Sequence, residues 1–331
     1  EKNEFNSLLK NYQVSGSDSI GINEAIELVK QWNYWRVFST TVPLAKAQFE
    51  QLDKAAAKNS KDPVIEAGAQ VSATAKIFIK NVTLLDVEKQ KLVPNETVCI
   101  TGNTITAIDT KNKTTVPADA VMIDGSGKFL MPGMTDAHVH FSQSGGLYTR
   151  PDVINLVSAM PYEKDIEWGK LNMQGVLKRY LQNGITNVID VGSTTNYLQL
   201  REKFAGKSYA PSVYMTGPLL TSYEPAAFKK YKEDSPFWQV ATPEDGRKMV
   251  QQQLPFHPDF IKIWYIVLGN NKEEQARKFL PTAKAIIEEA HAHNLKVAVH
   301  AMEKITAQLA VEAGCDFLVH SVTDEIISPD F

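Results

Sequence analysis

The stretch TDAHVH, residues 135–140, places His138 and His140 two positions apart at the end of an apolar run. Alternate side chains of a β-strand point to the same face, so Asp136, His138 and His140 would project together. Neutral imidazoles are common ligands of zinc and related divalent ions. Taken alone, the pair fits a metal site and equally fits two hydrogen-bonded histidines at a strand end.

Two further histidines end apolar runs later in the chain. His300 ends KVAVH and His320 ends DFLVH. A titratable ring after such a run is costly unless it finds a partner. Because the carboxyl ends of barrel strands meet on one rim, all four histidines would converge there. This convergence favours a metal site.

Lys262 lies in the middle of the apolar run DFIKIWYIV. It could extend to the rim or pair with a carboxylate. Alternatively, a buried lysine readily loses its proton, and its neutral amine can add carbon dioxide to form a carbamate. The two carbamate oxygens can bridge two metal ions. Tyr265, just past Lys262, is a candidate substrate contact at the rim, although aromatic side chains more often pack.

The other candidate residues indicate ordinary roles. His291 and His293 are expected near a helix end, where residues two apart do not share a face. His257 is expected in a loop. Cys99 and Cys315 lie far apart and indicate buried thiols, rather than a disulfide framework or a Cys-x-x-Cys metal site.

Strand-like and helix-like runs alternate from residue 129 onward, which predicts a parallel sheet. The expected strands cover residues 129–140, 185–192, 211–218, 259–267, 295–301 and 315–321. The expected helices cover residues 168–184, 281–294 and 305–314, the second starting at Pro281. No Gly-x-Gly-x-x-Gly motif follows a strand, which argues against a dinucleotide fold. The prediction is an α/β fold, a (β/α)8 TIM-type barrel with about six βα units present in this chain.

Three regions differ in character. Residues 1–70 predict a helical N-terminal extension, residues 71–128 a small β domain, and residues 129–331 the barrel, incomplete at its C-terminus. Apolar residues make up 43% and charged residues 22%, as in ordinary globular proteins. The net charge of −3 gives no footprint for nucleic acid, and no apolar run could span a membrane. The start at Glu1 suits a periplasmic or secreted protein after signal removal, or a cytoplasmic protein cut at a cloning boundary.

With these motifs in this order, the chain from about residue 75 to 325 resembles the metal-dependent amidohydrolase superfamily. The resemblance is carried by GKFLMPGMTDAHVH, GITNVIDVG, DFIKIW, KVAVHA and DFLVHS. The lysine in DFIKIW is similar to that of the imidazolonepropionase-like and Xaa-Pro dipeptidase-like branch. The resemblance implies a (β/α)8 barrel with a binuclear metal centre.

The resemblance also implies the role of each residue. His138 and His140 would bind one divalent ion, His300 and His320 the other, and carboxylated Lys262 would bridge the two, with zinc favoured. Asp136 would support these ligands without binding metal. A hydroxide formed from metal-bound water would attack the scissile carbonyl of an amide in a dipeptide or cyclic amide.

The family also uses an aspartate at the end of the eighth barrel strand, which moves the proton during hydrolysis. This chain stops before that strand, so the catalytic residue is unknown. Asp324 and Glu325, in the loop after the sixth strand, are not expected to replace it. The chain is expected to be a fragment of a longer enzyme, or to be completed by a second chain.

Other functions stay open at this stage. The same site could cleave lactones or phosphoesters, or the chain could be a non-catalytic or inactive amidohydrolase fragment. The expected partner is a small-molecule or dipeptide substrate. Neither nucleic acid nor a membrane is expected, and a homo-oligomer is possible.

Overall fold

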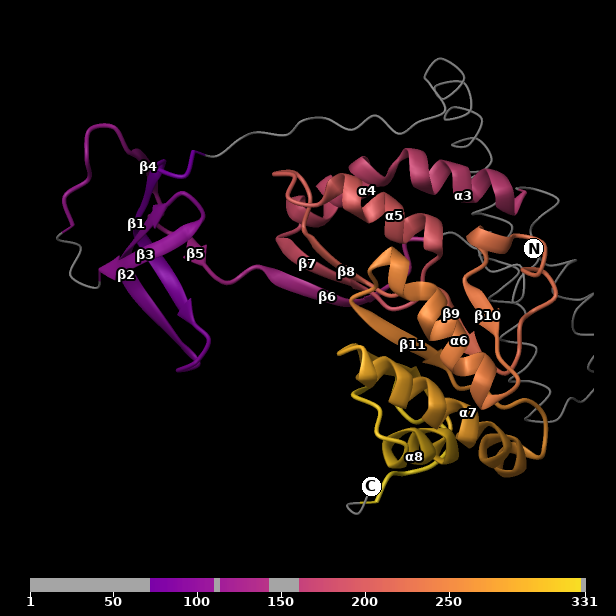
Figure 1. Ribbon diagram of the computed structural model, residues 1–331. Coiled ribbons are helices and arrows are strands. Elements are labelled where there is room, and N and C mark those ends of the chain that lie inside the picture. Colours follow the sequence, from indigo (N-terminus) through magenta and orange to yellow (C-terminus); the bar gives the residue numbers. More distant parts are fainter. Residues whose placement is uncertain (1–71, 110–113, 143–160, 329–331) are drawn as a thin grey trace, which may run out of the picture.

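The computed structural model describes residues 72–109, 114–142 and 161–328 (Figure 1). The predicted helical extension over residues 1–70 lies outside this part of the chain and stays a prediction. The described residues form a small β-sheet and, connected to it through one extended segment, an α/β part that carries all four candidate histidines. Among the described helices, none is long and apolar enough to cross a membrane.

The small sheet precedes the α/β part. Its strands are β1 (Lys76–Asp86), β2 (Lys91–Thr101), β3 (Thr104–Asp109), β4 (Val121–Asp124) and β5 (Phe129–Leu130). They follow the order β3-β2-β1-β4, with β5 also paired to β1. β1 and β2 are antiparallel, whereas β4 and β5 run parallel to β1, so the sheet is mixed. Gly102, with φ at +60°, makes the turn between β2 and β3.

Parallel strands form the centre of the α/β part. They are β6 (Met134–Val139), β7 (Ile185–Asp190), β8 (Ser212–Met215), β9 (Leu219–Thr221), β10 (Phe237–Gln239), β11 (Phe260–Trp264), β12 (Lys296–His300) and β13 (Phe317–Leu318). They pair in the orders β6-β7-β8 and β10-β9-β11-β12-β13. All of these pairings are parallel, as the alternating sequence pattern predicts. The α/β fold is thus consistent with a TIM-type barrel.

The two parallel sheets are continuous along the chain between β8 and β9, which are separated by three residues. The segment after β7 pairs with the segment between β8 and β9, because the Ser193 N–H donates a hydrogen bond to the Gly217 carbonyl. The Asp259 N–H donates to the Met215 carbonyl at 2.9 Å, which ties the end of β8 to the start of β11. Within the described residues, the three-stranded sheet ends at β6 and β8, the five-stranded sheet ends at β10 and β13, and no strand pairing joins β6 to β13.

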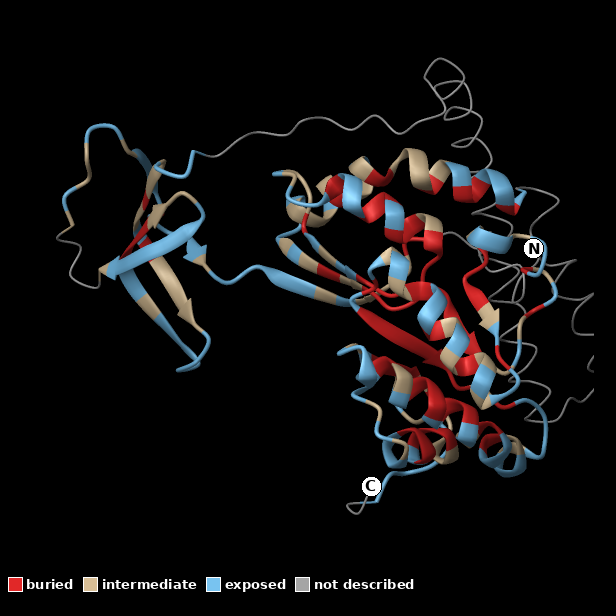
Figure 2. Ribbon diagram, viewed as in Figure 1, coloured by how far each residue is buried: buried red, intermediate tan, exposed pale blue. Residues whose placement is uncertain are grey.

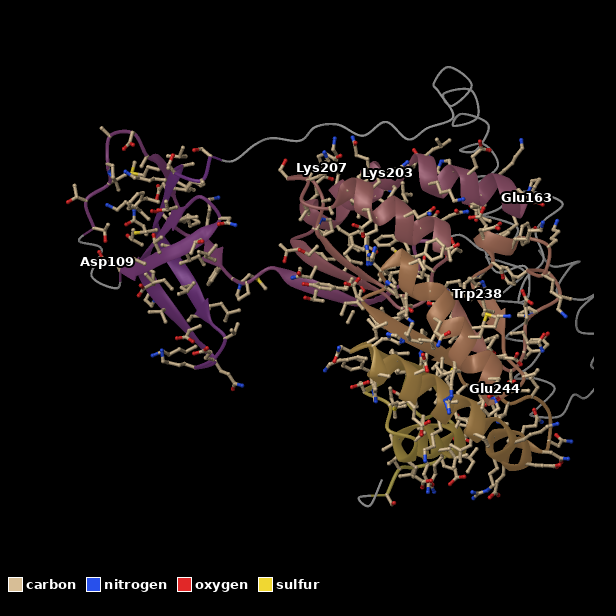
Figure 3. The ribbon with its side chains drawn as sticks, viewed as in Figure 1. Asp109, Glu163, Lys203, Lys207, Trp238 and Glu244 are labelled. Carbon is tan, nitrogen blue, oxygen red and sulfur yellow. The ribbon has the colours of Figure 1, made fainter. Side chains whose placement is uncertain are left out.

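Helices cover the outside of the strands. They are α3 (Tyr162–Leu171), α4 (Met173–Gln182), α5 (Thr195–Phe204), α6 (Pro243–Gln253), α7 (Lys272–Ala292) and α8 (Lys304–Glu312), with short 3-10 turns at Lys232–Asp234 and Leu254–Phe256. Figure 2 shows buried residues concentrated on β11 and on the faces of the helices that pack against the strands. The exposed Glu163, Lys203 and Glu244 belong to three of these helices (Figure 3).

Two predicted helix boundaries were wrong. The expected helix over residues 168–184 is two helices that meet at Asn172, whose side-chain amide donates to the Trp168 carbonyl. The helix expected to start at Pro281 begins at Lys272, and Pro281 lies inside it. Because Ala276 and Phe279 are buried with the core ahead of the proline, packing offsets the hydrogen bond that proline removes.

Removing the cap of α6 should destabilise the α/β part. Thr242 accepts a hydrogen bond from the Asp245 N–H at 3.1 Å, and the Asp245 carboxylate accepts from the Thr242 N–H at 3.1 Å. We expect Thr242→Ala to lower the free energy of unfolding by about 1 kcal/mol, measured by urea denaturation. The control Thr242→Ser keeps the cap and should change it little. Equal losses in both variants would contradict this role.

Candidate metal centre

The four histidines predicted from the sequence come together at the carboxyl ends of the strands. The ring centroids of His138 and His140 are 5.3 Å apart, and those of His138 and His320 are 4.7 Å apart. His300 and His320 are 4.3 Å apart. The rings therefore form one continuous cluster from β6 to β12 and β13. His138, on β6, meets His320, which follows β13.

Lys262 lies on β11 among these strands and is 1% exposed. Burial lowers the pKa of its amine to about 7, and the charge of Asp190 opposes that shift. In the described part of the chain, no hydrogen bond or ion pair to the Lys262 amine is found. The burial of Lys262 argues against the interpretation that it reaches the rim, and no ion pair with a carboxylate is found among the described residues. That it is an amine that readily loses its proton stays a prediction.

Two of the imidazoles are held in their neutral form. Burial lowers the pKa of His320 to about 4, helped by the positive charge of Lys262 and by His138. Burial and Lys262 also lower the pKa of His138, against a hydrogen bond to the Val319 backbone and the charge of Asp136. Neutral imidazole is the form that binds a metal ion.

Asp190 was not singled out from the sequence, yet it is the central carboxylate of this region. It ends β7 and is 0% exposed. Burial raises its pKa to about 7, although hydrogen bonds from the Phe141 and Gly192 N–H groups and the charge of Lys262 lower it. The sequence ITNVID could have identified Asp190, because a carboxylate at the end of a buried strand is costly unless it has a partner.

Asp136 lies beside the cluster, as expected. Its Oδ1 accepts a hydrogen bond from the backbone N–H of His138 at 3.4 Å, and its charge raises the pKa of the His138 ring. Asp136 therefore supports the strand end that carries His138.

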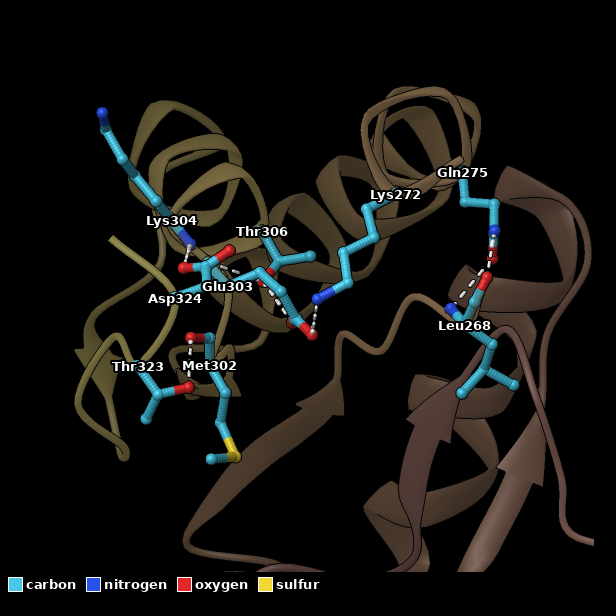
Figure 4. Close-up of polar contacts among 9 residues, drawn as sticks. All are labelled: Leu268, Lys272, Gln275, Met302, Glu303, Lys304, Thr306, Thr323 and Asp324. Carbon is cyan, nitrogen blue, oxygen red and sulfur yellow. Dashed lines mark hydrogen bonds and ion pairs between the residues drawn. The ribbon is translucent and has the colours of Figure 1, made fainter. Parts of the chain in front are cut away.

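The loops after β12 and β13 are tied to each other at the rim (Figure 4). The Thr323 N–H donates to the Met302 carbonyl at 2.9 Å, and the Lys304 N–H donates to the Asp324 carboxylate at 2.9 Å. The Lys304 amine also pairs with Glu325 at 2.9 Å. Asp324 and Glu325 are therefore both held by Lys304 at the rim.

The prediction that Tyr265 contacts substrate was wrong. Its side chain is 0% exposed, its hydroxyl donates to the Ala276 carbonyl at 2.6 Å, and its ring packs on Phe279. Alternation along the strand explains this result, because Lys262 and Trp264 share one face while Tyr265 points to the other, toward α7. The same rule, applied to the sequence, would have selected Trp264.

Trp264 instead connects the histidine cluster with an aromatic group on the neighbouring strands. Its ring lies edge-on to His300 at 6.0 Å and packs at 4.7 Å on Phe237. Tyr223, which follows β9, lies 6.5 Å from Trp264 and is 41% exposed. Tyr223 and Trp264 thus form an aromatic wall beside His300, with Tyr223 accessible to a ligand.

The remaining histidines and the cysteines are outside this cluster. His291 pairs with Asp316 at 2.9 Å and His293 with Glu289 at 3.2 Å, each at the end of α7. His257 is exposed, in the left-handed conformation after a 3-10 turn. Cys99 and Cys315 are free cysteines, the first buried and the second partly buried.

The donor set fits a divalent metal of the zinc type in chemistry and proximity. It combines four clustered imidazoles, two of them with lowered pKa, and a buried amine without a hydrogen-bond partner in the described chain. In the described ranges, no group of three or more His, Cys, Asp or Glu residues has the geometry to hold a metal ion. The fit therefore rests on donor type and on the closeness of the rings.

Comparison with solved structures agrees with the fold. A Xaa-Pro dipeptidase with bound methionine superimposes with a TM-score of 0.56 and 21% identity, covering 73% of this chain and 60% of that one. Phenylurea hydrolase B superimposes with a TM-score of 0.56 and 20% identity, covering 74% and 59%. This chain therefore spans less than two thirds of the length of either protein.

Comparison of sequences identifies the family. A 5-methylthioadenosine/S-adenosylhomocysteine deaminase from Carboxydothermus hydrogenoformans is 32% identical over 129 residues, which cover 36% of this chain and 27% of that protein. The model of the amidohydrolase family matches residues 129–325, which include every candidate metal ligand. Because this match covers more than half of the sequence, the chain belongs to the amidohydrolase family.

Proposed function

We propose that this chain carries the metal-binding part of a hydrolase that cleaves the amide bond of a small molecule, a dipeptide or a cyclic amide. One observation carries the proposal: four histidine rings, separated by 4.3 to 5.3 Å along the cluster, gather where the strands end. Amidohydrolases generally use divalent metals. The relatives named as a dipeptidase and a phenylurea hydrolase support a carbon–nitrogen bond as the target.

His138 and His140 would hold one divalent ion, and His300 and His320 the other, with zinc favoured by the imidazole donors. When bound, such ions lower the pKa of water and polarise a carbonyl oxygen, which is the chemistry that hydrolysis needs. Held neutral by burial, His138 and His320 keep a ring lone pair for this purpose.

Lys262 would bridge the two positions as a carbamate. Its burial favours the neutral amine, whose nitrogen adds to the carbon of carbon dioxide; a new nitrogen–carbon bond forms and the amine gives up one proton. The carbamate carries one negative charge, shared by its two oxygens, in place of an uncharged nitrogen. This change would give the metal ions an anionic neighbour.

Substrate contact is proposed for Tyr223, with Trp264 behind it. Tyr223 is 41% exposed and lies beside the ring that packs on His300. An apolar or aromatic group next to the scissile amide could stack on this wall. The acidic or basic group that moves the proton to the leaving amine is not assigned among the described residues.

The full 331-residue chain should bind about two zinc ions and lose the bridge when Lys262 is replaced. Metal content, measured by mass spectrometry after dialysis against zinc, should fall in Lys262→Met. The ¹³C NMR carbamate signal seen with labelled bicarbonate should disappear in the same variant. Lys230→Met, which removes an exposed lysine paired with Glu163, is the matched control. Equal metal content and an unchanged carbamate signal in Lys262→Met would overturn this role of Lys262.

Turnover distinguishes the proposed reaction from the alternatives. The zinc-loaded chain would be assayed with a dipeptide, a cyclic amide, a lactone and a phosphotriester. Cleavage of an amide with preference over the others supports the proposal. Preference for the lactone or phosphotriester would replace it, and metal binding without turnover of any of the four would favour a non-catalytic chain.

Removal of the exposed ring should weaken binding of apolar substrates. Tyr223→Ala is expected to raise KM about three- to tenfold for an amide with an aromatic side chain, with little change in kcat. Tyr214→Ala is the control, since Tyr214 is also exposed but belongs to β8. A KM that does not move in Tyr223→Ala, or that moves equally in both variants, would argue against contact with Tyr223.

A further inference from the structure

Asp190 connects the backbone of two strand ends. Its Oδ2 accepts a hydrogen bond from the Phe141 N–H at 2.9 Å, and its Oδ1 accepts one from the Gly192 N–H at 3.0 Å. Phe141 directly follows His140 in the sequence. One buried carboxylate thus holds the chain just after a candidate metal ligand and also the start of the loop after β7.

The loop held by Asp190 contacts the His140 ring. Nδ1 of His140 lies 2.7 Å from the Gly192 carbonyl oxygen, and the same nitrogen is 4.0 Å from Asp190 Oδ1. A carbonyl oxygen only accepts, so Nδ1 must be the donor in this bond. The proton of the neutral ring is then on Nδ1 and the lone pair on Nε2. A hydrogen bond to one ring nitrogen is how proteins orient a histidine that binds metal through the other.

A side chain at position 192 would crowd the His140 ring. A Cβ there would lie 3.0 Å from Cε1 and 3.1 Å from Nδ1 of His140, and 2.9 Å from Cδ1 of Leu219. Gly192 is not among the glycines with positive φ, so its backbone conformation is open to other residues. A side chain at position 192 would therefore act on the site by shifting the His140 ring or Leu219, and would not strain the backbone.

We propose that Asp190 is a positioning residue of the metal centre, which acts through Gly192 to fix the orientation and the Nδ1 proton of His140. The inference rests on the proposed function, because it assumes that His140 binds metal. A carboxylate with no exposed surface is costly to bury, and an apolar residue would avoid this cost. The hydrogen bonds of Asp190 to the loops after β6 and β7 explain why a carboxylate is buried at this position.

Two variants test the inference in different ways. Asp190→Asn keeps the size of the side chain but places an amide N–H₂, which cannot accept, against one of the two backbone N–H groups. Gly192→Ala leaves the carboxylate in place and crowds the ring directly. Asp259→Asn is the control, because Asp259 also accepts a backbone N–H, from Met215 at 2.7 Å, and pairs with Arg201 away from the histidines.

The measurements are made on the full chain without metal and then during zinc titration. In the metal-free protein at pH 8, ¹⁵N shifts of the His140 imidazole, assigned with His140→Gln, report which nitrogen carries the proton. We expect Nδ1–H in the original chain and a mixture of tautomers in Asp190→Asn and Gly192→Ala. Zinc affinity, from competition with a chelator, should fall about 10- to 100-fold in both. Asp259→Asn should lower the thermal midpoint and change neither the tautomer nor the affinity.

The outcomes separate this inference from the proposed function. If the original chain binds no zinc, the proposed function fails, while the tautomer in the metal-free protein still tests the link from Asp190 to His140. A lower thermal midpoint in Asp190→Asn with an unchanged tautomer would make Asp190 merely structural and overturn the inference. If Asp190→Asn does not fold, an unchanged His140 ring in Gly192→Ala overturns it equally.

Discussion

Lys262 carries an amine into the interior of the parallel strands, where water cannot hydrate its charged form. Its effects extend to each neighbour with a shifted pKa: it disfavours protonation of His138 and His320 and favours ionisation of Asp190. Burial remains the largest cause of the lowered pKa at both imidazoles, and the protonated form of Lys262 adds to it. The charge state of Lys262 therefore affects the protonation of His138, His320 and Asp190 together.

Much of the site could be predicted because costly residues stand out against apolar strands. His300 and His320 end apolar runs of the sequence, and Lys262 interrupts another, so each needed an explanation that barrel geometry supplied. The parallel pairing of the strands followed in the same way from alternation of strand and helix. His138 and His320 are far apart in the sequence. Their proximity could be predicted only because the carboxyl ends of parallel strands lie on the same rim.

The rest depended on packing that a sequence does not display. The helix through Pro281 persists because apolar residues on both sides of it are buried, which outweighs local propensity. The role of Asp190 required the coordinates, since its partners are the backbone N–H groups of Phe141 and Gly192 rather than side chains. Tyr265 is a different case, because strict alternation along the strand already placed it on the opposite face from Lys262.

That alternation has a consequence for how this site can be lost. Lys262 and Trp264 face the histidines only because their positions on β11 have the same parity. Insertion or deletion of one residue early in this strand would turn them toward the helices and bring Ile263 and Tyr265 inward. Such a one-residue shift of the strand register would therefore remove the Lys262 amine from the site. The composition of the chain and its apolar strand pattern would stay almost the same, and the strand could still pair.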